Sequence, residues 1–147
     1  MPESVPSRKK LLVADVPEMR PRLSRILGGL ELAFAATLED AVRAMSRRTF
    51  DLIVIGVHFD ESRMFDLMRH VRLDENNSAK PVVCVRGHLL ESTAISLEGL
   101  DIAIKALSGS GFVDFARFSD DAAGDAAIRR IIDRVLEING DMNPSQD

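Results

Sequence analysis

Charged and polar side chains follow several apolar runs of this sequence, at positions where buried strands would end. Asp15 follows the run at residues 11–14, His58 follows residues 52–57, and Arg86 follows residues 81–85. Because the carboxyl ends of parallel strands meet at one edge of a sheet, we expect these side chains to converge on one mouth. Together they could bind a small anion, but they form no nucleophile–base pair with the spacing of a known enzyme family.

Other reactive residue types have plainer interpretations. Asp60 and Glu61 are interpreted as solvated acids of the loop that follows residues 52–57. The three histidines show no metal-binding spacing such as His-x-x-x-His. Cys84 is the only cysteine and lies within an apolar run, which indicates a small buried hydrophobe and excludes an internal disulfide. We therefore expect no metal site.

The elements that would position Asp15, His58 and Arg86 alternate between apolar strands and segments of helical period. Strands are predicted at residues 11–14, 30–36, 52–57, 81–85 and 112–115, and the last two helices at residues 92–107 and 122–138. This alternation predicts an α/β fold, a flavodoxin-like doubly wound parallel sheet of order 2-1-3-4-5 with helices on both faces. We expect one domain over residues 1–147, with an ordered core at about 9–138 and polar tails at 1–8 and 139–147.

Composition excludes several classes of function. The net charge of −4 argues against a nucleic-acid surface, which needs a basic face. The sequence shows no apolar stretch of membrane-spanning length and no signal peptide, so no membrane association and a cytoplasmic location are expected. No glycine-rich phosphate-binding motif follows a strand, so no nucleotide cofactor is predicted.

Four segments in order resemble the receiver domain of bacterial response regulators, the CheY-like family. They are KKLLVAD (residues 9–15), DLIVIGV (51–57), KPVVCV (80–85) and AIKALSGSGFVDF (103–115). The resemblance extends from about residue 9 to residue 138 and implies the same flavodoxin-like fold. The segment between residues 86 and 115 is several residues longer than is usual in that family.

The resemblance also implies which positions would carry phosphoryl transfer. In receivers, two acids after the first strand and an acceptor Asp hold Mg²⁺, while a Ser/Thr and a Lys stabilise the phosphoryl oxygens. The first acid is present as Asp15, but the second is Val16, the acceptor is Gly56, the Ser/Thr is Arg86 and the Lys is Phe115. Without a nucleophile the covalent step is lost. The sequence therefore predicts a degenerate receiver with no catalytic residue, metal or cofactor.

Two of the matched positions keep alternative interpretations. Arg86 either crosses the gap above Gly56 to pair with Asp15, or faces solvent from its strand end. Phe112 stands at the position of the receiver switch aromatic, and it is either a rotamer switch or an ordinary core residue. Val16 and Phe115 are interpreted as apolar filling of a pocket that no longer holds ions.

The function predicted from these observations is a receiver-like signalling domain that works without phosphorylation, by protein–protein interaction, in a bacterial two-component-type pathway. Its partner would be a kinase or an output protein, bound through a face that includes Leu89, Leu90 and Ile95, and a homodimer through this face is a further option. The alternative is a small-ligand-binding or enzymatic domain on a flavodoxin-like fold, with its site at the strand carboxyl ends.

Overall fold

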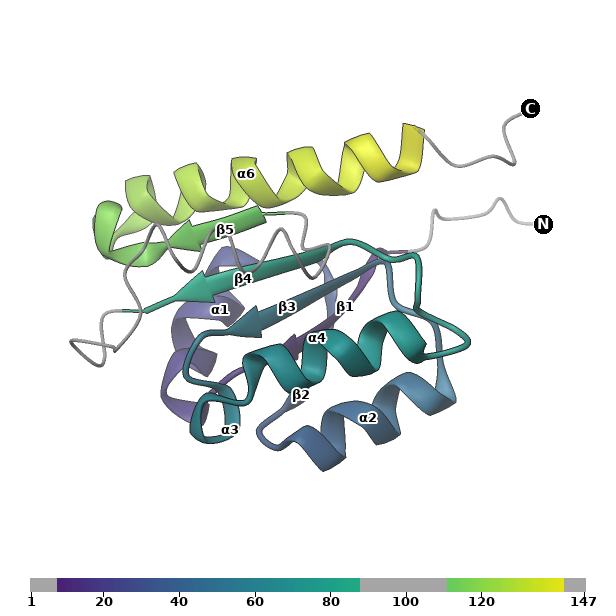
Figure 1. Cartoon of the computed structure of the whole chain (residues 1–147). Helices are drawn as coiled ribbons and strands as arrows, with labels where there is room; N and C mark the ends of the chain where they lie inside the picture. Colours follow the sequence, from purple (N-terminus) through teal and green to yellow (C-terminus); the bar gives the residue numbers. More distant parts are fainter. Residues whose placement is uncertain (1–7, 88–110, 142–147) are drawn as a thin grey trace.

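Five parallel strands form one sheet in the order β2-β1-β3-β4-β5 (Figure 1). The computed structural model describes residues 8–87 and 111–141 of the chain. The strands are β1 (Lys10–Ala14), β2 (Glu31–Ala35), β3 (Leu52–Gly56), β4 (Val82–Arg86) and β5 (Gly111–Asp114). This arrangement confirms the predicted doubly wound sheet of order 2-1-3-4-5.

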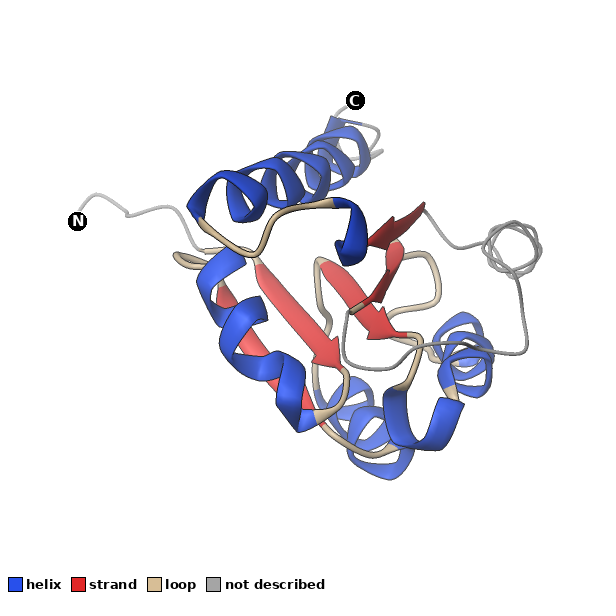
Figure 2. Cartoon of the chain, turned by 90° about the vertical axis from the view of Figure 1, so that its left-hand side faces the viewer, coloured by secondary structure: helices blue, strands red, loops and turns tan. Residues whose placement is uncertain are grey.

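Helices cover both faces of the sheet (Figure 2). They are η1 (Pro17–Met19), α1 (Arg20–Ile26), α2 (Leu38–Arg47), α3 (Phe59–Ser62), α4 (Met64–Leu73), η2 (Phe115–Arg117) and α6 (Ala122–Asp141). On one face α1 packs against α6, and on the other α2 packs against α4. Within the described ranges, no helix combines the length and the apolar character needed to cross a bilayer.

The central strand β3 contributes to both layers of the core. Ile53 and Ile55 pack into the cluster that includes residues of α2 and α4, whereas Leu52 and Val54 pack into the cluster that includes residues of α1 and α6. Successive side chains of a strand point to opposite faces. A strand covered on both faces must therefore be apolar throughout, and this explains the uninterrupted run Leu-Ile-Val-Ile.

Arginine side chains join α1 to α6. The buried side chain of Arg22 donates from Nε to Asp125 at 3.2 Å and from Nη2 to the carbonyl oxygen of Ser119 at 2.8 Å. Arg129 on α6 donates to two carbonyl oxygens at the carboxyl end of α1, at 3.1 and 2.8 Å. These carbonyls have no partner within their own helix, so the arginine satisfies them and fixes the two helices together.

The carboxyl-terminal part of the chain differs in detail from its prediction. The fifth strand ends at Asp114, and Phe115 begins the turn η2 instead of ending the strand. Asp114 causes this change of course because its Oδ1 accepts a hydrogen bond from the backbone N–H of Ala116 at 3.1 Å. The last helix continues to Asp141, past its predicted end at residue 138. The helix predicted at residues 92–107 lies outside the described residues.

Candidate functional site

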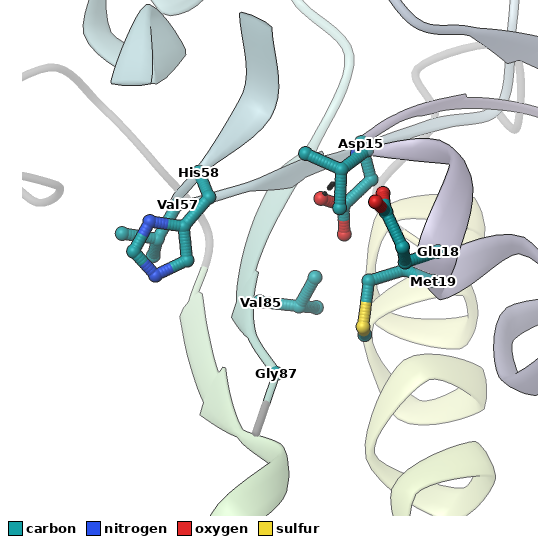
Figure 3. A pocket seen from close by; sticks show the side chains of 8 residues that line it. Asp15, Glu18, Met19, Val57, His58, Val85 and Gly87 are labelled. Carbon is teal, nitrogen blue, oxygen red and sulfur yellow. Dashed lines mark hydrogen bonds between the residues drawn. The ribbon is translucent and has the colours of Figure 1, made fainter. Parts of the chain in front are cut away.

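The carboxyl ends of β1, β3 and β4 surround a cavity of about 290 Å³ (Figure 3). Asp15 follows β1 directly, and Val57 and His58 follow β3. The turn η1 and the segment before it supply the remaining wall. The residues that line the cavity are Asp15, Val16, Glu18, Met19, Val57, His58, Val85 and Gly87. Three segments that are distant in sequence therefore build one site, at the edge of the sheet where α/β folds place their ligands.

A side chain at position 56 would have no room beside Asp15. A Cβ atom built on Gly56 would lie well inside 3.0 Å of both Oδ1 and Cγ of Asp15, a separation that real Cβ atoms do not adopt. The backbone N–H of Val16 donates to Asp15 Oδ1 at 2.7 Å and holds the carboxyl group in place. The carboxyl group of Asp15 thus fills the space that an acceptor side chain would need.

Burial changes the acidity of Asp15. The residue is only 8% exposed, and this burial raises the pKa of its carboxyl group from 3.8 to about 7. The hydrogen bond from Val16 opposes the increase by favouring the ionised form, while the negative charge of Glu18 adds to it. The carboxyl group of Asp15 is therefore about half protonated near neutral pH.

Both interpretations of Arg86 are wrong: it does not pair with Asp15, and it does not face solvent from its strand end. Arg86 instead donates from Nη1 to Asp114 Oδ2 at 3.3 Å, with 21% of the arginine side chain and 7% of the aspartate side chain exposed. The two residues are direct register partners on β4 and β5. Adjacent strands lie about 5 Å apart, so Asp114 is nearer than a carboxylate on the far side of β3. Arg86 neither crosses to Asp15 nor lines the cavity.

His58 lies across the cavity from Asp15 and Glu18 (Figure 3). Its side chain is half-buried, and its buried Nε2 has no hydrogen-bond partner in the described part of the chain. Burial lowers the pKa of the imidazole, and the nearby charge of Arg86 lowers it further. The histidine therefore faces the cavity region as a neutral ring near neutral pH.

The other residues that the receiver resemblance singled out lie in the cavity wall, in the core, or outside the described residues. Val16 lines the cavity, whereas Phe115 is fully buried in the core, with the Arg22 guanidinium 5.1 Å from its ring centroid. Phe112 is half-buried and packs against the opposite core cluster, beside α2 and α4. The predicted partner-face residues Leu89, Leu90 and Ile95 lie outside the described residues.

Asp60 has a structural role that the sequence interpretation missed. Its Oδ2 accepts a hydrogen bond from the backbone N–H of Leu38 at 2.7 Å, at the first turn of α2. To reach that position, Asp60, Glu61 and Ser62 adopt left-handed backbone angles, with φ of 44°, 57° and 68°. Such angles cost roughly 1–2 kcal/mol per non-glycine residue. Asp60 is thus a helix cap and not a solvated loop acid, while Glu61 is exposed as expected.

Several lining residues were also missed by the sequence interpretation. Glu18 and Met19 belong to the turn η1, and Val57 and Val85 lie at strand ends. Their position directly beside strand termini is the signal that could have identified them. The Met19 side chain lies where a Cβ on Gly87 would be, so glycine at that position lets the thioether form part of the wall.

The residues present do not fit a Mg²⁺ site of the receiver type. Among the described residues, Asp15 and Glu18 are the carboxyl groups that line the cavity, and Gly56 offers no side-chain ligand atom where the third would be. Mg²⁺ requires near-octahedral coordination by oxygen. Among the described residues, no group of three or more His, Cys, Asp or Glu side chains could hold a metal ion.

No family model matches the sequence, and no curated protein matches it. Solved structures with the same architecture are response-regulator receiver domains. A response regulator from Hahella chejuensis has 20% identity and a TM-score of 0.69, with 87% of this chain and 94% of that chain covered. The chemotaxis protein CheY4 of Vibrio cholerae has 22% identity and a TM-score of 0.68, with 88% and 99% covered.

A third similar structure holds a metal ion. It is the receiver domain of a sensor histidine kinase from Pseudomonas aeruginosa, with magnesium coordinated in its active-site cleft. It has 19% identity and a TM-score of 0.67, with 89% of this chain and 99% of that chain covered. At these identities the similarity concerns the fold. The chain has the CheY-like fold of receiver domains.

Proposed function

We propose that this chain is a receiver-like signalling domain of a bacterial two-component-type pathway that acts by protein–protein interaction, without phosphorylation of an aspartate. The fold shared with receiver domains supports the signalling class. The observation that carries the proposal is the overlap between Asp15 and any side chain at Gly56. A side chain at position 56 would require Asp15 to move, so the packing as well as the residue type supports a chain without an acceptor there.

Asp15 is a poor substitute for the acceptor. Its carboxyl group is buried, half protonated near neutral pH and held by the N–H of Val16. Among the residues described, no lysine or arginine lines the cavity to stabilise phosphoryl oxygens, since Arg86 is directed to Asp114. Loss of one such donor alone lowers rates roughly 10²–10³-fold.

The proposed partner is a kinase or an output protein in the cytoplasm. We place its contact on the face that includes Leu89, Leu90 and Ile95, from the apolar character of that segment in the sequence. A homodimer through the same face is the alternative arrangement.

Phosphorylation can be tested directly. The full chain is incubated with Mg²⁺ and acetyl phosphate, and separately with Mg²⁺ and beryllofluoride, beside a receiver that has an intact acceptor aspartate. Intact mass and melting temperature are then measured. We expect an adduct and a shift for the control receiver and neither for this chain. A gain of one phosphoryl group that hydroxylamine removes would refute the proposal.

A second candidate function is that of a small-ligand-binding domain with its site at the strand carboxyl ends. The cavity of about 290 Å³ favours it, because the volume is close to the lower end of known ligand sites.

A further inference from the structure

We propose that the cavity at the carboxyl ends of β1, β3 and β4 binds a small organic cation, an ammonium group carried on an apolar body. The inference rests on the second candidate function and names its ligand class. It differs from the small anion that the sequence interpretation considered for this site. The charges, walls and volume of the cavity each support it.

The charged side chains among the described lining residues are acidic. Asp15 and Glu18 lie on one side of it (Figure 3), and the described lining residues include no lysine or arginine. The guanidinium of Arg86, which the small-anion interpretation needed, is paired with Asp114 on the neighbouring strand. Among the described lining residues, an anion would therefore meet carboxyl groups and no cationic side chain, whereas an ammonium group would be attracted.

Asp15 has hydrogen-bonding capacity left for such a group. The residue is 8% exposed and lines the cavity. Oδ1 accepts the N–H of Val16, while Oδ2 accepts no hydrogen bond from a described residue. An ammonium group has three N–H donors and no acceptor, so it can satisfy Oδ2 of Asp15 and the carboxylate of Glu18 together.

Apart from His58 and Gly87, the remaining described wall is apolar and suits a hydrocarbon body. Val16, Met19, Val57 and Val85 supply it, and the Met19 thioether is a soft, adaptable surface. A volume of about 290 Å³ equals about ten water molecules at ~30 Å³ each in the liquid. The cavity therefore accepts a body of about eight to twelve heavy atoms.

Three probes of one shape and different charge test the ligand class. Benzylamine, benzyl alcohol and benzoate are titrated into the full ¹⁵N-labelled chain, and amide shifts of Val16, Val57 and Gly87 are followed by NMR. We expect benzylamine to bind at least about tenfold more tightly than benzyl alcohol, and benzoate to leave these amides unchanged. Benzylamine shifts confined to residues away from the cavity would overturn the proposal.

Matched variants connect the binding to the acidic wall. Glu18 is exposed, so Glu18→Gln should fold normally, weaken benzylamine about threefold and leave benzyl alcohol unchanged. Glu75→Gln makes the same charge change in the exposed connection before β4, at the opposite end of the sheet, and should alter neither probe. Val16→Phe should fill the cavity and abolish both, with folding checked by circular dichroism.

The possible outcomes distinguish the proposal that the ligand is a cation from the proposal that the cavity binds a small ligand at all. Equal binding of benzylamine and benzyl alcohol, or binding of benzoate, would overturn the cation proposal while leaving a ligand-binding domain in place. Failure of all three probes to shift the cavity amides would overturn both the cation proposal and the second candidate function.

Discussion

Replacing Asp15 with asparagine should stabilise the fold above neutral pH and reduce its pH dependence. The carboxyl group is buried, with its pKa raised from 3.8 to about 7. Asparagine has nearly the same shape, keeps an oxygen for the N–H of Val16 and carries no charge. The substitution therefore removes the cost of a buried charge and leaves the packing beside Gly56 in place.

The size and sign of this effect follow from linkage. A shift from 3.8 to about 7 is about three pKa units, or about 4 kcal/mol at ~1.36 kcal/mol per unit. The pKa of Asp15 is higher in the folded state than in the unfolded state. Its protonation therefore contributes to the free energy of unfolding fully below about pH 4, and this contribution is lost as the pH rises through about 7. Because the fold relaxes around an ionised Asp15, we expect a measured difference of about 2–4 kcal/mol between pH 4 and pH 8.

Urea unfolding of both proteins, followed by circular dichroism at intervals from pH 4 to pH 8, measures this difference. Hydrogen bonds from Arg25 hold the pKa values of Asp120 and Asp125 below their usual range, so these groups contribute stability that is lost at low pH. They are present in both proteins and cancel in the comparison. The free energy of unfolding of Asp15→Asn minus that of the wild type should increase with pH.

A difference that stays within about 0.5 kcal/mol over this range would refute the reasoning, because it would show that the Asp15 carboxyl group is solvated. Glu61→Gln is the control. It neutralises an exposed acid in α3, the short segment after β3, and the difference in free energy of unfolding should not change with pH.

Two further predictions concern the same edge of the sheet. Gly56→Ala should destabilise the wild type by about 1–3 kcal/mol in urea unfolding, because the added Cβ overlaps Asp15. The same substitution should cost much less in an Asp15→Ala background. Equal losses of stability in both backgrounds would contradict the overlap. In a double-mutant cycle, Arg86→Ala and Asp114→Ala should show a coupling energy of about 1–2 kcal/mol, since the ion pair is largely buried. In a second cycle, the effects of Arg86→Ala and Asp15→Ala on stability should add within about 0.5 kcal/mol. Coupling of Arg86 to Asp15 in place of Asp114 would contradict the observed pairing.

The sheet order could be predicted because it depends on local pattern. The run at residues 52–57 is apolar on both faces, as a strand between two helical layers must be, and its neighbours alternate with helical periods. Right-handed crossovers then leave few arrangements for five such units. The mouth at the carboxyl ends follows from that order, which is why Asp15, Val16 and His58 were expected there and line the cavity.

The partner of Arg86 could not be predicted because it depends on the register between β4 and β5. A long segment separates these strands in the sequence, so the residue that pairs with Arg86 across the sheet cannot be predicted from the apolar pattern. The structure places Asp114 there. The helix cap by Asp60 was missed for a different reason. It requires three consecutive left-handed residues without a glycine, an arrangement that local propensity argues against.

The glycine at position 56 and the buried aspartate at position 15 depend on each other. Asp15 can lie against β3 only because Gly56 has no side chain. A side chain can be placed at position 56 only if Asp15 moves. Moving Asp15 would also break its hydrogen bond with Val16. An aspartate introduced at 56 would meet a second carboxyl group at close range without a bound Mg²⁺ ion to offset the repulsion. The residue change and the packing therefore both support the proposal that this chain acts without phosphorylation.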